Sequence, residues 1–158
     1  MNLIEVIKSW FRPPPVAAIE ALSRPDRLWH KVTASSFADE ADVIAFRKAK
    51  ARGMTDMEAF RYGDNGVGWT GLDCTQENVP YCALPPDDWV ARWGTKKSAG
   101  GRPVYVRING KIIQGWLGDT MPAKKHIKNG AGIDLNPGFA KAFGLHPPFM
   151  VKAEWSWG

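Results

Sequence analysis

Gly118-Asp119-Thr120-Met121-Pro122 is followed, after a basic loop, by Gly130-Ala131-Gly132-Ile133-Asp134-Leu135-Asn136-Pro137, and these two stretches carry the strongest structural signals of the sequence. Each places an acid, Asp119 or Asp134, at the end of an apolar segment. Apolar residues flank Asp134 on both sides, so a strand here would leave that carboxyl group in a partly dry environment. Because burial raises the pKa of a carboxyl group, Asp134 is a candidate general acid.

An Asp just ahead of a helix is most often a cap or a turn residue, and that ordinary role must be weighed first. In this sequence Asn136 is the better N-cap, Pro137 suits the first helical position, and Gly144 suits the stop of a helix over Gly138 to Phe143. Asp134 is therefore not needed as the cap. Burial with a purely structural hydrogen bond remains the alternative.

The residues from Tyr62 onward read as short strands separated by turns. Asn109-Gly110 is typical of a type I′ hairpin and joins an alternating strand before it to a second strand over 111–117. The last residues, 149–157, alternate apolar and polar side chains with a clear period of two. These patterns predict a small β-barrel over residues 62–158.

The first 61 residues read as helices. Short helices are expected over 2–11 and 16–22, and a better-marked helix ends at Gly53, with Ser35 and Ser36 offering its N-cap. Thr55 to Glu58 forms a capping box that opens a further short helix. We therefore expect a helical N-terminal region over 1–61 that packs on the barrel and shares its core.

The composition is that of a globular chain of one-domain size: 158 residues, 44% hydrophobic and 23% charged. The net charge of +5 favours an anionic partner, such as nucleic acid, a membrane surface or an anionic cell-wall polymer. Without a zinc-finger spacing or an RNA-binding aromatic signature, nucleic acid is the weaker choice. Lys96 to Arg102 reads as a flexible basic link.

No apolar stretch has the length of a membrane span, and the N-terminus does not resemble a standard secretory signal. We expect no stable membrane insertion, and either a cytoplasmic role or export by host lysis, a phage particle or a dedicated secretion machine. Cys74 and Cys82 either form one disulfide or are two small buried residues. No histidine stands at a spacing that would complete a metal site with them, so neither a metal nor another cofactor is expected.

The order of elements in the second half resembles the double-psi β-barrel group. It comprises a hairpin, a strand ending in Asp119-Thr120, a loop, Gly-x-Gly-Ile-Asp-Leu-Asn-Pro at 130–137, a short helix with Ala-x-x-x-Gly-Leu, and a final strand. The group includes expansins, family 45 endoglucanases, rare lipoprotein A-like lytic transglycosylases, membrane-bound lytic transglycosylases of the A type and the 3D domain. The resemblance covers about residues 62–157 and implies a six-stranded double-psi barrel, mainly β with α, preceded by the helical region.

The resemblance also implies an enzyme or binder that acts on β-1,4-linked polysaccharide. The group's acid in an Ile-Asp-Leu setting falls on Asp134, which would protonate the glycosidic oxygen, and the Asp of its Asp-Thr element falls on Asp119. Tyr62-Gly63-Asp64 looks like the first-strand Tyr-x-Asp of the endoglucanases, where the Asp is the base. The basic loop at 123–129 and the helical region depart from the group's pattern.

The resulting hypothesis is glycosidic-bond cleavage in peptidoglycan by a monomer that acts on the cell wall, in the periplasm or outside the cell. Asp134, Asp119 and Asp64 are the candidate catalytic residues. If the sugar's own hydroxyl attacks, Asp134 alone suffices as acid and base, as in a lytic transglycosylase; if water attacks, a second carboxylate is required, as in an inverting hydrolase. The candidate substrate-binding residues are aromatic stacking platforms, a hydroxyl and cations near the cleft: Tyr62, Trp69, Trp116, Thr120, Lys125 and His126.

Two alternatives come from other classes of protein. The same cleft would serve a non-catalytic wall-binding or expansin-like wall-loosening module without turnover. The N-terminal helices would serve a protein-interaction or inhibitor domain. Core packing is the competing explanation for each tryptophan, and a solvated loop for the lysines at 124–128.

Overall fold

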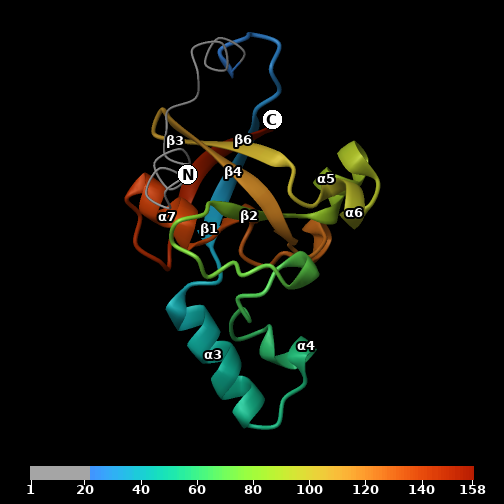
Figure 1. Ribbon diagram of the computed structural model, residues 1–158, viewed down its shortest axis with the longest axis vertical. Helices are drawn as coiled ribbons and strands as arrows, with labels where there is room; N and C mark the ends of the chain where they lie inside the picture. Colours follow the sequence, from blue (N-terminus) through green and yellow to red (C-terminus); the bar gives the residue numbers. More distant parts are fainter. Residues whose placement is uncertain (1–21) are drawn as a thin grey trace, which may run out of the picture.

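The computed structural model describes residues 22–158, and their strands close into a six-stranded mixed β-barrel (Figure 1). The helices expected over 2–11 and 16–22 lie outside the described residues, apart from Leu22. Among residues 22–158 no helix is both long and apolar enough to cross a membrane.

The described elements follow the chain in a mixed order of strands and short helices. They are β1 (His30–Ser36), α3 (Glu40–Ala51), α4 (Asp56–Ala59), the 3-10 helix η1 (Trp69–Gly71), β2 (Tyr81–Leu84), α5 (Pro86–Trp93), α6 (Lys96–Ala99), β3 (Pro103–Ile108), β4 (Lys111–Thr120), the 3-10 helix η2 (Lys124–His126), β5 (Ala131–Leu135), α7 (Pro137–Phe143) and β6 (Met150–Trp157).

Around the barrel the strands run in the order β1-β5-β2-β4-β3-β6 and close on β1. Two neighbouring pairs are parallel, β1 with β5 and β2 with β4, and the other pairs are antiparallel. Each parallel pair contains one shift of register, between Thr33 and Ala34 in β1 and between Cys82 and Ala83 in β2. Such bulges bend a strand and redirect its side chains, which helps a small sheet to close.

The apolar side chains at alternate positions of the strands fill the barrel interior. Along β3 the exposure alternates, so that Val104, Val106 and Ile108 are buried, and Trp155 of β6 is 1% exposed. The predicted hairpin is confirmed: Asn109 and Gly110 have φ of 49° and 80°, as a type I′ turn requires. The core therefore lies inside the barrel, and polar side chains on the same strands point outward.

The capping signals are confirmed at two of the predicted helices. Asn136 caps α7 by accepting from the backbone N–H of Phe139, and Gly144 ends it with φ of 70°. Thr55 and Glu58 form the capping box of α4. The helix α3 differs from expectation, because its N-cap is Asp39.

The barrel begins before the predicted boundary between residues 61 and 62. Its first strand is β1, at His30–Ser36, where only Val32 and Ala34 are apolar, so the local pattern of side chains hardly indicates a strand. β1 pairs with β5 on one side and β6 on the other, and these partners supply the burial that its own residues do not signal. Ser35 and Ser36 thus belong to a strand rather than to a helix cap.

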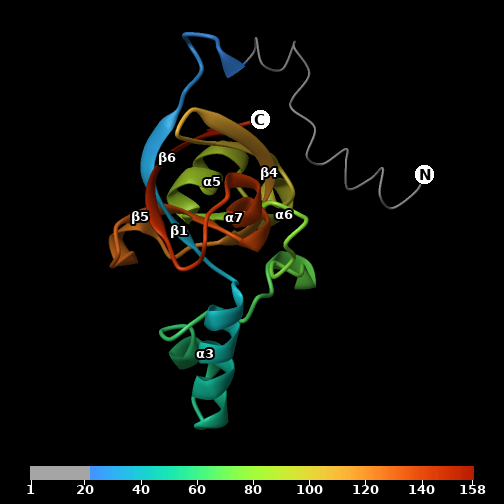
Figure 2. The same cartoon turned by 90° about the vertical axis from the view of Figure 1, so that its left-hand side faces the viewer.

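Two further expectations need correction. Tyr62, Gly63 and Asp64 lie in a loop after α4, so they are not the first strand of the barrel. The expected flexible link at 96–102 contains the helix α6, capped by Thr95, which accepts from the backbone N–H of Ser98. Helices α5 and α6 lie beside the barrel, whereas α3 and α4 extend away from one end of it (Figures 1 and 2).

Candidate active site

A cavity of about 690 Å³ opens at the end of the barrel where β1, β2, β4 and β5 meet the segment from α3 to η1. We call it the acid pocket, because among the described residues four aspartates line it. Its lining comprises Ser35, Ser36, Phe37, Asp42, Phe60, Arg61, Tyr62, Gly63, Asp64, Val67, Ala83, Asp119, Thr120, Met121, Pro122, Asn129 and Asp134. The three acids predicted from the sequence, Asp64, Asp119 and Asp134, therefore share one cavity.

Asp134 lies on β5, between Ser35 of β1 and Ala83 of β2. Because side chains alternate along a strand, Asp134 faces the pocket while Ile133 and Leu135 are buried on the opposite side. The Ser35 hydroxyl donates a hydrogen bond to Asp134 Oδ1. The carboxyl group is thus enclosed by the pocket walls rather than by its own sequence neighbours.

The environment of Asp134 favours its protonated form. Burial raises its pKa to about 7, against the Ser35 hydrogen bond, which lowers it. The negative charges of Asp64, Asp42 and Asp119 raise it further, in that order. A carboxyl group with a pKa near 7 carries a transferable proton at neutral pH, which is what a general acid requires.

Asp119 is the last residue but one of β4 and pairs with Ala83, the same residue that pairs with Asp134 from the other side. The two acids are therefore two strands apart, or about 9–10 Å between Cα atoms at ordinary sheet spacing. The small side chain of Ala83 leaves the space between them open. Burial raises the pKa of Asp119 to about 6, and the hydrogen bond of 2.8 Å that it accepts from the Thr120 N–H opposes this rise.

Asp64 reaches the pocket from the loop that follows α4. It accepts a hydrogen bond of 2.7 Å from the backbone N–H of Gly66, and burial raises its pKa. Gly63 holds the loop close to α3, because a Cβ at Gly63 would lie 2.1 Å from the carbonyl oxygen of Asp42. Only glycine permits this approach, and the approach brings Asp64 against the barrel end.

Asp42, in the first turn of α3, is an acid of this pocket that sequence reasoning missed. It accepts a hydrogen bond of 3.1 Å from the backbone N–H of Ala38, and burial with the charges of Asp39 and Asp64 raises its pKa to about 6. An acid in a first helical turn normally serves the helix dipole, so the sequence offered no reason to single it out. The buried Ala38 has φ of 58°, which places backbone strain at the pocket edge.

The predicted substrate-binding residues fall into three places. Tyr62 and Thr120 line the acid pocket, Tyr62 at its exposed rim. Trp69 and Trp116 line a separate cavity of about 840 Å³. Lys125 and His126 lie in the 3-10 helix η2, are exposed, and are not among the described residues that line either cavity.

The two cysteines are free, buried thiols. Burial raises the pKa of Cys74 to about 12 and that of Cys82 as well, so both are protonated at neutral pH. Within residues 22–158 no three or more His, Cys, Asp or Glu side chains are grouped so as to hold a metal ion.

The chain was compared with protein families, with curated proteins and with solved structures. No family model matches the sequence, and no curated protein matches it. The structure is similar to Streptomyces papain inhibitor, with 19% sequence identity and a TM-score of 0.46, over 84% of this chain and 96% of that chain.

Proposed function

We propose that the acid pocket cleaves β-1,4-glycosidic bonds of peptidoglycan, in the manner of a lytic transglycosylase, with Asp134 as general acid and base. One observation supports this above the others: Asp134 faces a cavity large enough for a sugar, and its pKa is raised to about 7. A carboxyl group in an ordinary surface position would have lost its proton at neutral pH and could not protonate a leaving group.

In the proposed reaction Asp134 donates its proton to the glycosidic oxygen as the bond from that oxygen to C1 breaks. The C6 hydroxyl of the same sugar attacks C1 and closes a 1,6-anhydro ring. The proton of that hydroxyl passes to the Asp134 carboxylate, which restores the acid. No water molecule is consumed, so a single acid/base group completes the cycle.

Asp42, Asp64 and Asp119 are proposed to support Asp134 electrostatically. Negative charge on these groups keeps the proton on Asp134, and the same charges stabilise the positive charge that develops on the sugar ring in the transition state. Ser35 is a positioning residue, since its hydroxyl fixes one oxygen of Asp134 and leaves the other free to face substrate.

We further propose that the barrel is of the double-psi type. Its two parallel strand pairs each carry one register shift, and the elements from β3 to β6 follow the order that resembles that group. The likeness supports a polysaccharide substrate, and the pocket chemistry supports cleavage rather than binding alone.

The test is product analysis with purified protein and isolated peptidoglycan. We expect released muropeptides with 1,6-anhydro ends from the wild type and a loss of at least about a hundredfold in Asp134→Asn, the usual contribution of a general acid. Reducing ends in place of anhydro ends would instead identify a hydrolase, with Asp64 or Asp119 as the base. Binding without products would contradict both forms of cleavage, and undiminished activity in Asp134→Asn would contradict the role of Asp134.

A further inference from the structure

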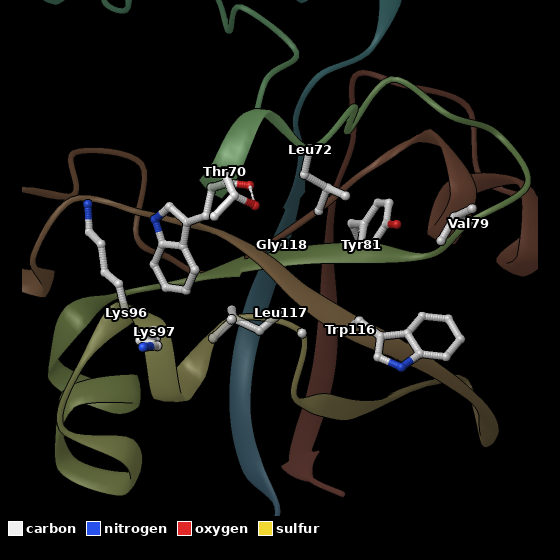
Figure 3. A pocket seen from close by; sticks show the side chains of 12 residues that line it. Thr70, Leu72, Val79, Tyr81, Lys96, Lys97, Trp116, Leu117 and Gly118 are labelled. Atoms are coloured by element: carbon white, nitrogen blue, oxygen red, sulfur yellow. Dashed lines mark hydrogen bonds between the residues drawn. The ribbon is translucent and has the colours of Figure 1, made fainter.

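A second large cavity lies on the outer face of β2 and β4, next to the acid pocket. We call it the tryptophan pocket; its volume is about 840 Å³, and it is lined by Trp69, Thr70, Leu72, Val79, Tyr81, Lys96, Lys97, Gly100, Gly101, Trp116, Leu117 and Gly118 (Figure 3). Along β4, Trp116 and Gly118 line this cavity while the next residue, Asp119, lines the acid pocket. The two cavities are therefore neighbours on one strand.

The segment around η1 packs across β4 between the two cavities. A Cβ at Gly68 would lie 2.3 Å from the carbonyl oxygen of Gly118, and a Cβ at Gly118 would lie 3.0 Å from a methyl group of Leu72. The backbone of the η1 segment therefore contacts the backbone of β4 directly, because neither Gly68 nor Gly118 has a side chain. A ligand longer than one pocket would contact this crossing on its way from one cavity to the other.

The floor of the tryptophan pocket is apolar and aromatic. Trp116 of β4 and Tyr81 of β2 are partners in the parallel ladder, and both project into the cavity, with Leu72 near them (Figure 3). Trp69 packs edge-on against the buried Trp89, with ring centroids 5.2 Å apart, which fixes its ring. Flat, fixed aromatic faces of this kind pack against the apolar face of a pyranose ring.

Two cations lie at one end of this cavity. Lys96 and Lys97 project from α6 at the end opposite Trp116 (Figure 3). Neither forms a salt bridge with a carboxylate of the described residues, and Lys96 Nζ lies 5.8 Å from the centre of the Trp69 ring. An apolar floor beside two ammonium groups that have no salt-bridge partner among the described residues matches a ligand with an apolar face and an anionic group.

We propose that the tryptophan pocket is a saccharide subsite that selects a sugar bearing a carboxylate, with the ring against the aromatic floor and the carboxylate at Lys96 and Lys97. The choice of a wall saccharide as ligand rests on the function proposed above. The two cavities carry opposite charge, which would orient a saccharide bound across both of them. An acidic sugar is favoured at α6 and disfavoured among the aspartates.

The charge of Lys96 also affects a residue of the acid pocket. The positive charge of Lys96 lowers the pKa of Asp119, although burial raises that pKa on balance.

The proposal is tested by calorimetric binding to Asp134→Asn protein, which avoids turnover. The probes are a muramic-acid-containing tetrasaccharide with free lactyl carboxylates, the neutral N-acetylglucosamine tetramer, and phenylacetate as a carboxylate without a sugar. Lys96→Gln with Lys97→Gln should weaken binding of the acidic tetrasaccharide about three- to tenfold, as expected for two exposed ion pairs, and leave the neutral tetramer unchanged. Trp116→Ala should weaken the binding of both saccharides.

The matched control is Lys48→Gln with Lys152→Gln, which removes the same charge from exposed positions outside both cavities. Its affinity for the acidic tetrasaccharide should stay within about twofold of that of the Asp134→Asn parent protein. Equal loss in the control, equal affinity for acidic and neutral tetramers, or phenylacetate binding as tight as the saccharide would overturn the proposal. If selective binding persists while the wild type yields no cleavage products, the subsite stands and the proposed enzymatic function fails.

Discussion

Asp134 and Ser35 form the pair on which the chemistry depends. The Ser35 hydroxyl donates to Asp134, and this hydrogen bond stabilises the ionised carboxylate and so lowers a pKa that burial raises to about 7. Ser35 therefore helps to set the pH at which Asp134 loses its proton. No sequence pattern indicates this partnership, because the sequence suggests a helix cap at Ser35 and because Ser35 is 99 positions from Asp134.

Removing the Ser35 hydroxyl should move the pH dependence of cleavage. In the wild type kcat/KM should fall as the pH rises through about 7, since the general acid loses its proton there. In Ser35→Ala the charged form of Asp134 loses a stabilising donor, so the falling limb should shift to higher pH. Ser36→Ala, which removes a neighbouring hydroxyl that donates no hydrogen bond to Asp134 in the described structure, is the control and should leave the limb in place.

At the scale of the elements, the loop between α4 and η1 positions Asp64. Gly63→Ala should lower activity at least tenfold, because a Cβ would lie 2.1 Å from the carbonyl oxygen of Asp42 and the loop must move away from the pocket. Gly53→Ala is the matched control. Gly53 has φ of 88° with nothing within 4 Å of its Cβ position, so this change strains the backbone without displacing the loop.

The outcome for Gly53→Ala should be a modest loss of stability, about 1 kcal/mol, with cleavage intact. Cleavage rates of the two variants, measured at a temperature where circular dichroism shows both to be folded, separate the effects. Equal activity in Gly63→Ala and the wild type would mean that the position of Asp64 does not matter to the reaction.

Asn136 joins β2, α7 and the segment before β2. Its side chain, 0% exposed, accepts from the backbone N–H groups of Tyr81 and Phe139 and donates to the carbonyl oxygens of Cys74 and Val79, among others. Asn136→Ala leaves these buried groups without partners, so the free energy of unfolding should fall by about 3–5 kcal/mol. Urea denaturation measures this change.

The comparison variant is Asn129→Ala, which removes the one hydrogen bond that the Ala131 N–H donates to Oδ1 of the exposed Asn129. It should lower the free energy of unfolding by under about 1 kcal/mol. A similar small loss in Asn136→Ala would show that the Asn136 network does not hold these elements together.

The elements that could be predicted from the sequence are those with complete local signals. The Asn109-Gly110 hairpin, the Asn136 cap with its Gly144 stop, and the strand β6 are confirmed because each depends on residues close in the chain. The predicted alternation along β6 holds as far as Trp155 and ends at Ser156, which is buried. The strand β1 was missed because its burial comes from β5 and β6, which lie about a hundred residues later. Asp42 was missed for the same reason, since its neighbours in the pocket come from distant segments.

For the molecule as a whole, the buried carboxyl groups make stability depend on pH. The folded pKa values of Asp42, Asp119 and Asp134, about 6, 6 and 7, lie above the value of 3.8 for an ordinary aspartate. Between about pH 4 and pH 7 the folded state therefore binds more protons than the unfolded state. The free energy of unfolding should fall as the pH rises through this range, and it should be higher at pH 5 than at pH 8.

Urea denaturation of the wild type and Asp134→Asn at both pH values measures how much of this pH dependence comes from Asp134. The variant should lose less stability on going to pH 8, because one pKa unit corresponds to about 1.4 kcal/mol and Asn does not titrate. His30, whose pKa burial lowers, acts in the opposite direction but is common to both proteins and cancels in the comparison. An identical loss in the two proteins would show that Asp134 does not titrate in this range.

The proposed chemistry requires that Asp134 keeps its proton to near-neutral pH in the folded protein. Its most direct test is a carbon-13 NMR titration of the aspartate carboxyl groups, with the Asp134 resonance assigned from Asp134→Asn. We predict that this resonance titrates near pH 7, and near a higher pH in Ser35→Ala. A midpoint near pH 4, the ordinary value for an aspartate, would rule out Asp134 as the general acid, because it would then have no proton to donate at neutral pH.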